Sequence, residues 1–421
     1  MNINYHYYTI KTLAHHAGFD DEKAQLIAHF SQRVDDYIMF SPFIVKEKPP
    51  NFFIDIGLAE KIKNRDMWAF MPCPTGVNVL ASIHKKYRLY TVMPFHFITQ
   101  SPYHKLPKNC NRSHYRCVAA ENPNEKLLIN RLIKETADRV KANINDNTSL
   151  MALGMVLHTF ADTYAHEKFS GFKGWENKYR ISNMKHKSST QGLSKQKINF
   201  YSVLPSIGHA NVFHVPDYCD CKIELFGKEK ENSKMELMVD RDNSVFFSDC
   251  SKRILNILCG ITGKSLNNNE WNTLQKKLLE VYSFSKEPNL EKWEKTFKDT
   301  KGGNISYNYN KKDYFKLEFK LLHWNKNELK NKLKHIYQHE DIKDICQYQE
   351  SKVAENELTN MDSVDGDILR DDCITYVDKP TKMFYDYNEL AYLHVHNVTN
   401  EYRSNSLKEL RVFIKNATNV L

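Results

Sequence analysis

Three side chains that can bind a metal stand four residues apart in the segment Leu150–Gly171 (LMALGMVLHTFADTYAHEKFSG): His158, Asp162 and His166. No glycine or proline interrupts Met155–Phe169, so a helix is expected there. At about 100° per residue, spacings of four and eight place all three within roughly 80° of one helix face. Two imidazoles and a carboxylate on one face are ligands for first-row metals, and most naturally for zinc.

The neighbours of these three residues are apolar or small, so the helix is expected to be buried nearly all round. They are Met155, Leu157, Phe160, Ala161 and Ala165. Burying ionisable groups in such surroundings is costly unless the groups are paired or bound to metal. A core histidine and aspartate that satisfy each other by hydrogen bonds are the alternative, but three groups in register favour a metal site.

Other candidate ligands lie in the first 220 residues. They are His6, Asp35 with Asp36 beside it, His96 in MPFHF, and His209, His214 and Asp217 in PSIGHANVFHVPD. Each is a weak indication by itself, because a single histidine is more often structural or exposed than a ligand. Cys219 and Cys221, as CDC, could also bind metal, although two neighbouring thiols are more often simply thiols.

The bulk composition predicts a folded protein without membrane or export segments. In 421 residues the hydrophobic content is 41% and the aromatic content 12%, ample for a packed core. No apolar run approaches the length of about 18 residues typical of a transmembrane helix, and the N-terminus lacks the basic and apolar regions of a signal peptide. The nine cysteines form no CxxC pattern, which predicts reduced thiols in a cytoplasmic protein.

The formal net charge of +9 comes largely from lysine. Lysine and asparagine are abundant together, as an AT-rich genome would encode, so part of this charge reflects codon usage. What remains predicts a mild preference for anionic partners such as phosphates, lipid surfaces or nucleic acid. Nothing in the chain resembles a Walker loop, a dinucleotide fingerprint or a GxSxG elbow.

Apolar periodicity predicts a mostly helical protein. Beside the ligand-bearing helix, we expect helices over residues 9–17, 21–37, 125–144, 245–259, 271–284, 318–337 and 388–402. Residues 41–115, richer in proline and aromatics, are expected to form loops with one or two short strands. The polar stretch 171–206 is expected to be an exposed excursion over the site. A domain boundary is placed near residue 240, because 13 of the 18 histidines precede it.

The order of the candidate ligands resembles that of the zinc-dependent phospholipase C and fungal single-strand nuclease superfamily. More narrowly, four segments within roughly residues 1–220 look like an uncharacterised bacterial branch of it: HYYTIKTLAHHAGFDDEKAQLIAHFSQRVDD, FHF, LGMVLHTFADTYAHEKFSGF and IGHANVFHVPD. The resemblance implies an all-helical, phospholipase C/nuclease-like core at residues 1–240 with a three-zinc site. Residues 241–421 would then form a helical C-terminal region of unknown function.

Carried over by position, the resemblance implies eight metal ligands: His6, Asp35, His96, His158, Asp162, His166, His209 and Asp217. Among them Asp162 would bridge two metals and His6 would ligate the outlying zinc. Asp36 is the one-residue alternative to Asp35 as the first acidic ligand. In secreted relatives the amine and carbonyl of a processed N-terminal tryptophan complete the outlying site. Here the Met1 amine or water would serve, unless that metal is absent.

These residues predict a phosphoesterase that binds one to three zinc ions and acts on a phosphodiester or a phospholipid headgroup. Clustered divalent ions activate water and neutralise a phosphodiester's charge, and an aspartate of the pair Asp35 and Asp36 that does not bind metal would take the water's proton as general base. Two alternatives stay open. One is a non-catalytic interaction protein with a structural metal site and a basic partner-binding C-terminal half, and the other is a single-strand nuclease whose aromatic residues stack bases.

Overall fold

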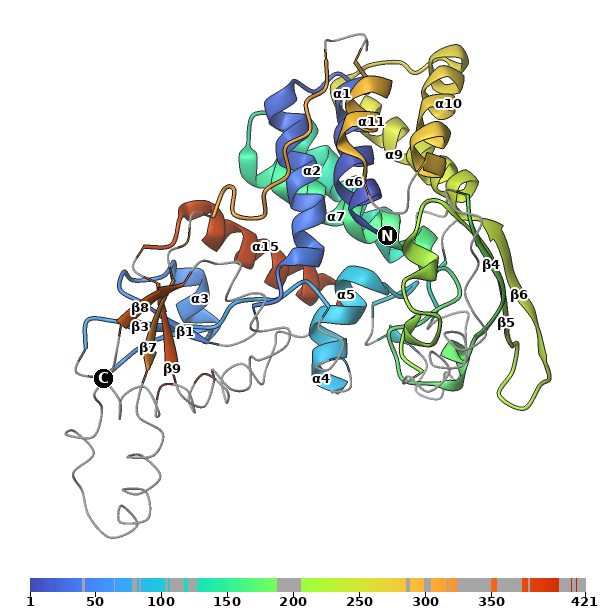
Figure 1. Cartoon of the computed structure of the whole chain (residues 1–421). Coiled ribbons are helices and arrows are strands. Elements are labelled where there is room, and N and C mark those ends of the chain that lie inside the picture. Colours follow the sequence, from blue (N-terminus) through green and yellow to red (C-terminus); the bar gives the residue numbers. More distant parts are fainter. Residues whose placement is uncertain are drawn as a thin grey trace. The chain divides into compact units, whose positions relative to one another are not determined.

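Figure 1 shows the computed structural model of the chain. The chain divides into two compact units. Unit 1 comprises residues 1–36, 79–309 and 397–400, and unit 2 comprises residues 37–78, 310–396 and 401–421. Residues 243–309, which follow the boundary expected near residue 240, thus lie in unit 1. The structure describes residues 1–39, 42–63, 65–77, 82, 85–102, 105–106, 117–119, 127–187, 206–284, 288–298, 304–315, 317, 319–323, 350–353, 373–377, 379–400, 410 and 414.

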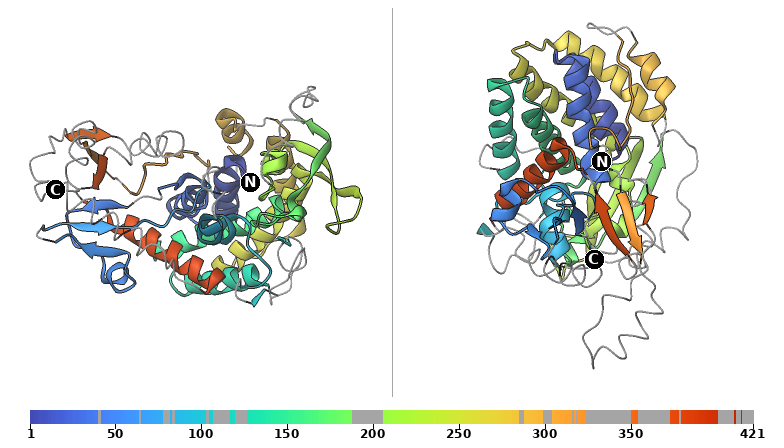
Figure 2. Two further views of the ribbon diagram at one scale, coloured as in Figure 1. Left: turned by 90° about the horizontal axis from the view of Figure 1, so that it is seen from below. Right: turned by 90° about the vertical axis from the view of Figure 1, so that its left-hand side faces the viewer.

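Most of unit 1 is helical, and its helices lie beside one another in Figure 2. Their bounds are η1 Asn4–Thr9, α1 Ile10–His16, α2 Asp21–Asp36, α4 Lys85–Tyr87, η3 Arg88–Val92, α5 Met93–His96, α6 Leu128–Ala142, α7 Asn147–Ala165, η5 Trp175–Asn177, η6 Ala210–Val212, η7 Val215–Asp217, α9 Asn243–Thr262, α10 Asn268–Phe284 and α11 Leu290–Thr296. Helices expected at 9–17, 21–37, 125–144, 245–259 and 271–284 are therefore confirmed.

Helix α7 is the centre of this unit. The Asp146 side chain caps its first turn by accepting hydrogen bonds from the backbone of Thr148 and Ser149, and every residue from Leu150 to Ala165 is buried. Helix α2 packs most extensively against it. The two backbones meet at Gly154, where a side-chain carbon would lie 2.4 Å from the carbonyl oxygen of Ile27. A glycine is required here for the close approach.

Unit 1 also contains a three-stranded antiparallel sheet, in the order β4-β5-β6. Its strands are β4 Arg180–His186, β5 Cys221–Lys228 and β6 Met235–Asp242. Along β5 buried residues alternate with more exposed ones, and Cys221, Ile223 and Leu225 face the core. They pack in a hydrophobic cluster that includes Phe169 and Val212.

Unit 2 is built around a six-stranded sheet in the order β2-β3-β1-β9-β7-β8, in which only β1 and β9 pair in parallel. Its elements are β1 Phe43–Val45, α3 Asn51–Asp55, β2 Ala59–Lys61, β3 Trp68–Phe70, β7 Phe319–His323, β8 Glu350–Val353, β9 Cys373–Val377 and α15 Lys382–Thr399. Residues 41–115, expected to form loops with one or two short strands, contain three short strands and also the helical elements α3, α4, η3 and α5, so that expectation is only partly correct. Helix α15 confirms the helix expected near 388–402.

The expected mostly helical fold with a helical C-terminal extension is wrong, because the chain is mixed α and β. The helix expected over residues 318–337 begins instead as strand β7, whose partner β9 lies about 50 residues further along the chain; residues 324–337 lie outside the described part. Such long-range pairing leaves no mark in local periodicity.

The polar stretch 171–206 is expected from the sequence to be an exposed excursion, but part of its described residues forms a strand with buried side chains. Residues 180–186 form strand β4, which buries Ile181 and Met184. A register shift between Ile181 and Asn183 breaks the period-two pattern that would have indicated a strand. In the described part of the chain, no helix has the length and apolar character needed to cross a membrane.

Candidate metal centre

The eight residues expected as ligands come together in unit 1, and we call them the His/Asp centre. Helical elements supply five of the eight residues: His6 comes from η1, Asp35 from α2, His96 from α5, and both His158 and Asp162 from α7. Helices α2, α5 and α7 are labelled in Figure 1. His166 follows directly after α7, His209 precedes η6 and Asp217 ends η7. Residues more than 200 positions apart in sequence therefore share one site.

Four ligand atoms of the centre lie close to one another. The Nδ1 of His96 is 3.1 Å from Asp162 Oδ2 and 3.3 Å from His158 Nε2, and His158 Nε2 is 3.4 Å from Asp162 Oδ2. Asp35 Oδ1 is 3.8 Å from both imidazole nitrogens. A divalent ion bound at about 2.0–2.3 Å by tetrahedral ligands places them about 3.3–3.8 Å apart. The donor atoms therefore fit a metal ion.

The second oxygens of both carboxylates face another imidazole. His6 Nε2 lies 3.1 Å from Asp162 Oδ1 and 3.9 Å from Asp35 Oδ2, and the His6 and His158 rings stack with centroids 3.8 Å apart. The Met1 amine also forms a buried ion pair with Asp162 Oδ1. Asp35 and Asp162 thus each present one oxygen to His6 and the other to His96 and His158.

A third group forms around Asp217. His166 Nε2 lies 3.0 Å from Asp217 Oδ1, and His209 Nε2 lies 3.5 Å from Asp217 Oδ2. His214 Nδ1 is 3.4 Å from the same Oδ2. The Met1 amine, 3.5 Å from Asp217 Oδ1, lies between this group and Asp162. His166, His209 and Asp217 together could hold a metal ion.

Backbone carbonyl groups orient three of the imidazoles. Each Nδ1 lies within hydrogen-bond distance of a carbonyl oxygen: His158 of Ser31 (2.8 Å), His166 of His96 (2.7 Å) and His209 of Phe213 (2.6 Å). An Nδ1–H that donates to a carbonyl leaves the lone pair on Nε2, the atom that faces the centre in all three residues. This is the usual arrangement of metal-binding histidines.

Burial keeps His6, His158 and His209 neutral. It lowers the pKa of His6 to about 4, with help from the Met1 ammonium, and it lowers the pKa of His209 to about 4. The pKa of His158 falls well below its usual value for the same reason, and the nearby His6 adds to the decrease. Neutral imidazoles carry the lone pairs that a metal requires.

The carboxylates have unusual electrostatic surroundings. Burial would raise the pKa of Asp162, but the Met1 ammonium and His166 hold it well below its usual value. Desolvation raises the pKa of Asp35 to about 8 against the lowering effect of His96, and Asp162 adds to the increase. Two carboxylates that face the same imidazoles, His6, His96 and His158, are surroundings that a divalent cation would stabilise.

The centre has a buried floor and a partly exposed rim. The side chains of His6 and His158 are 0% exposed and that of Asp162 is 2% exposed. On the rim, the exposed fractions are 31% for Asp35 and 55% for His214. Solvent can therefore reach one side of the ligand set.

Asp36, the sequence alternative to Asp35, has a different environment. It accepts a hydrogen bond from the hydroxyl group of Tyr309, whereas both oxygens of Asp35 face the imidazoles. His214 is a candidate ligand in the sequence but is not among the eight expected ligands. Its place three residues before Asp217, in HVPD, is the signal that could have added it to the group.

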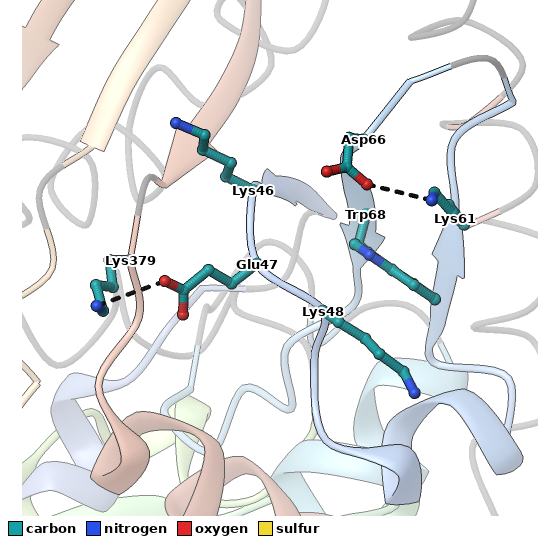
Figure 3. Close-up of a pocket in the computed structure, with 7 residues that line it drawn as sticks. All are labelled: Lys46, Glu47, Lys48, Lys61, Asp66, Trp68 and Lys379. Carbon is teal, nitrogen blue, oxygen red and sulfur yellow. Dashed lines mark ion pairs between the residues drawn. The ribbon is translucent and has the colours of Figure 1, made fainter.

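A separate surface pocket lies in unit 2, as Figure 3 shows. Its lining residues are Lys46, Glu47, Lys48, Lys61, Asp66, Trp68 and Lys379. Both carboxylates pair with lysines, at 3.2 Å for Lys61–Asp66 and 3.5 Å for Lys379–Glu47. The lining combines charge with one aromatic ring but contains no histidine or cysteine. The groups of three or more metal-binding side chains found among the described residues lie in unit 1.

Comparison with known proteins gives one match. No curated protein and no solved structure matches the chain. The sequence model of a family of unknown function, DUF6765, matches residues 1–402. Because this match spans almost the whole chain, the protein belongs to that family.

Proposed function

We propose that the protein is a zinc-dependent phosphoesterase acting on a phosphodiester or a phospholipid headgroup. The observation that carries the proposal is the position of Asp35 and Asp162, whose two oxygens each face different imidazoles. Carboxylates in such positions suit a site with two or more ions. Imidazole and carboxylate ligands together favour zinc among the common divalent metals.

The number of ligands favours catalysis over a structural role. A closed structural zinc uses four protein ligands, whereas eight expected ligands and His214 gather here. Bound zinc ions would lower the pKa of a water molecule and neutralise charge on the phosphoester. The exposed rim at Asp35 and His214 leaves a side from which a substrate could approach.

Within this proposal the residues have distinct tasks. His6, His96, His158 and Asp162 form the floor that fixes the ions. Asp35, at the rim, would accept the proton of the attacking water through an oxygen that is not bound to an ion, while the bond from phosphorus to the leaving oxygen would break and solvent would protonate that oxygen. Asp36 is the less suitable base, because its carboxylate accepts the Tyr309 hydrogen bond.

Single-strand nuclease activity is a second candidate, favoured by Phe213. Its side chain is 43% exposed, and its ring lies 4.3 Å from that of His214. Phe213 also has a φ of 53°, a strained conformation that costs about 1–3 kcal/mol for a residue other than glycine. An aromatic ring held at the rim could stack on a base.

Metal analysis followed by a substrate screen tests the proposal. Protein purified without chelator is expected to contain at least one zinc per chain and to hydrolyse bis-p-nitrophenyl phosphate or p-nitrophenyl phosphorylcholine. The Asp35→Asn variant should lose about 100-fold or more in kcat/KM, while Asp66→Asn, the same change at a 97% exposed carboxylate of unit 2, should retain activity.

The pattern of substrates separates the candidates. Hydrolysis of single-stranded nucleic acid that falls in Phe213→Ala would favour the nuclease. A metal-loaded protein that is inert towards phosphodiesters, phospholipids and single-stranded nucleic acid would favour the non-catalytic alternative, in which the metal is structural and the basic C-terminal half binds a partner.

A further inference from the structure

A second group of metal-binding side chains lies at one end of the unit 1 sheet, and we call it the Cys221 cluster. His186, the last residue of β4, is the register partner of Cys221, the first residue of β5. Asp220 immediately precedes β5. One ligand atom from each of the three residues lies within 4.8 Å of the others.

The side chains of Asp220 and Cys221 both approach the same imidazole nitrogen, Nδ1 of His186. His186 Nδ1 is 3.0 Å and 2.9 Å from the two oxygens of Asp220, and 3.3 Å from Cys221 Sγ. The Sγ atom is further, 3.9 Å, from His186 Nε2. A Cys–His–Asp catalytic relay requires the thiol and the carboxylate on opposite nitrogens of the ring. The Cys221 cluster does not have that arrangement.

We propose that His186, Asp220 and Cys221 bind a divalent transition-metal ion of the zinc class, at a site separate from the His/Asp centre. A single Nδ1 has either one proton or one lone pair in the ring plane, so without a metal it can at most share one proton between Asp220 and Cys221. An ion placed between the three residues would be shared by all of them. The distance of 3.9 Å between Cys221 Sγ and Asp220 Oδ1 leaves space for it.

The choice of metal follows from the donor set. A thiolate and an imidazole favour zinc and similar ions over magnesium or calcium, which prefer oxygen ligands. Asp220 and Cys221 are 0% exposed and the His186 side chain is 15% exposed. Three protein ligands leave a fourth position for water or another donor, and the solvent-facing edge of His186 is where it could lie.

The neighbouring Lys187 is engaged elsewhere. Lys187 follows His186 in sequence, but its ammonium group lies 2.7 Å from Asp242 Oδ2 and 2.7 Å from Ser244 Oγ. Only its backbone N–H reaches Asp220, donating to the carbonyl oxygen at 2.9 Å. Lys187 therefore does not replace the proposed cation at the Asp220 carboxylate.

A metal here would fasten β4 to the segment that enters β5. Asp217 of the His/Asp centre lies three residues before Asp220, and the intervening Tyr218 ring contacts His186 with centroids 5.7 Å apart. The metal would therefore hold the backbone that presents Asp217. This role requires no turnover, so it stands or falls independently of phosphoesterase activity.

Cobalt substitution of the full-length protein tests the proposal. After removal of metals with a chelator, Co²⁺ should give a near-ultraviolet thiolate-to-cobalt charge-transfer band that saturates at one thiolate-bound ion per chain. The ligands of the His/Asp centre are nitrogen and oxygen atoms, so cobalt bound there contributes no sulfur band. Zn²⁺ should displace the band.

Three variants assign the band to its ligands. Cys221→Ser should abolish it, and His186→Ala should weaken cobalt binding in the same titration by about tenfold or more. Cys219→Ser is the matched control, because this buried thiol two residues away contacts Asn2 and should not affect the band. Circular dichroism reports folding, and if Cys221→Ser does not fold, the partly exposed His186 decides the question.

Two results would overturn the proposal. One is cobalt binding to the native protein without a sulfur band, which would leave an ordinary His186–Asp220 hydrogen bond beside a thiol. The other is a band that survives both Cys221→Ser and His186→Ala, which would assign it to another of the nine cysteines. Loss of phosphoesterase activity alone affects neither outcome.

Discussion

The two ligand groups of unit 1 are built on different backbones. The His/Asp centre takes His158 and Asp162 from successive turns of α7, so a single helix orients both side chains towards the centre. The Cys221 cluster takes its histidine and its thiol from facing positions of two strands. Ligands on one helix can be recognised from sequence spacing, whereas ligands on paired strands depend on a register that only the fold determines.

The two groups also differ in how their carboxylates are used. Asp162 presents one oxygen to His6 and the other to His96. Asp220 presents both of its oxygens to the same nitrogen of His186. The first arrangement suits several ions with open positions, and the second suits a single ion. We therefore expect chemistry at the first group and a fastening role at the second.

The largest expected effect is that of Asp162→Ala. Asp162 contacts the Met1 amine and four imidazoles, so its loss removes the nearest counter-charge of the buried amine and an acceptor that these imidazoles share. We expect the free energy of unfolding to fall by about 3–5 kcal/mol and the His/Asp centre to lose its metal. Urea unfolding and metal analysis measure the two effects.

This variant also tests whether the two groups are independent. The thiolate-to-cobalt band of the Cys221 cluster should survive in folded Asp162→Ala protein. If the band disappears together with the metal of the His/Asp centre while the fold remains, the two groups form one coupled site and the comparison fails.

Gly154→Ala should have a smaller effect, through geometry alone. The added methyl group would meet the carbonyl oxygen of Ile27 at 2.4 Å and the backbone nitrogen of Ser31 at 3.0 Å. Helices α2 and α7 must then separate, which lengthens the distance from His158 on α7 to Asp35 on α2. We expect a loss of about 1–3 kcal/mol of stability and weaker zinc binding, measured by thermal unfolding and by competition with a chelator.

Gly260→Ala is the matched control for that change. Gly260 also lies inside a helix, α9, but no atom lies within 4 Å of a side-chain carbon added there. Alanine should stabilise the protein by about 0.5–1 kcal/mol, because glycine is a poor helix former. Equal effects of the two substitutions would show that the α2–α7 contact does not position the ligands.

The contrast between the groups also explains what the sequence could and could not predict. The helices around the His/Asp centre have strong apolar periodicity, and the ligand spacing in α7 follows directly from 3.6 residues per turn. Placing His6, Asp35 and His96 beside α7 required the resemblance, because nothing local in their segments specifies a distant partner. The structure brings them within 4 Å of one another or of Asp162.

Features that depend on strand pairing were missed. Strand β4 lies in a lysine- and serine-rich stretch with an irregular register, so its sequence resembled a loop. The sequence therefore indicates no partner for His186, and it indicates Cys221 only as one of two neighbouring thiols, with Cys219. Only the pairing of β4 with β5 brings these residues together, across a separation of 35 positions.

The smallest expected loss of stability concerns His16, an imidazole that neither group uses. It lies at the end of α1, with Nδ1 2.9 Å from the carbonyl oxygen of Thr12. Burial lowers the pKa of His16 to about 4 against the raising effect of this hydrogen bond, and the charges of Lys264, His15 and Lys277 lower it further. Burial and these neighbouring charges therefore keep His16 neutral, and burial likewise keeps His6 and His158 of the His/Asp centre neutral.

The consequence is a loss of stability in acid. The unfolded chain takes up a proton near the ordinary pKa of 6.5, while the folded protein resists protonation. Stability is thus fully present above pH 6.5 and falls as the pH decreases towards 4. Between pH 7 and pH 5, His16 should account for a loss of about 1–2 kcal/mol.

His16→Gln isolates this contribution, because it removes the titrating group but keeps a side chain that can donate to Thr12. Urea unfolding of wild-type and variant protein at both pH values gives two differences in free energy, from which any release of metal common to both proteins cancels. The variant should be less stable than the wild type at pH 7 and should regain about 1–2 kcal/mol relative to it at pH 5. A difference that does not change with pH would mean that His16 titrates normally in the folded protein. Burial by itself would then not keep an imidazole of this fold neutral, and the neutrality of those in the His/Asp centre would have to come from bound metal.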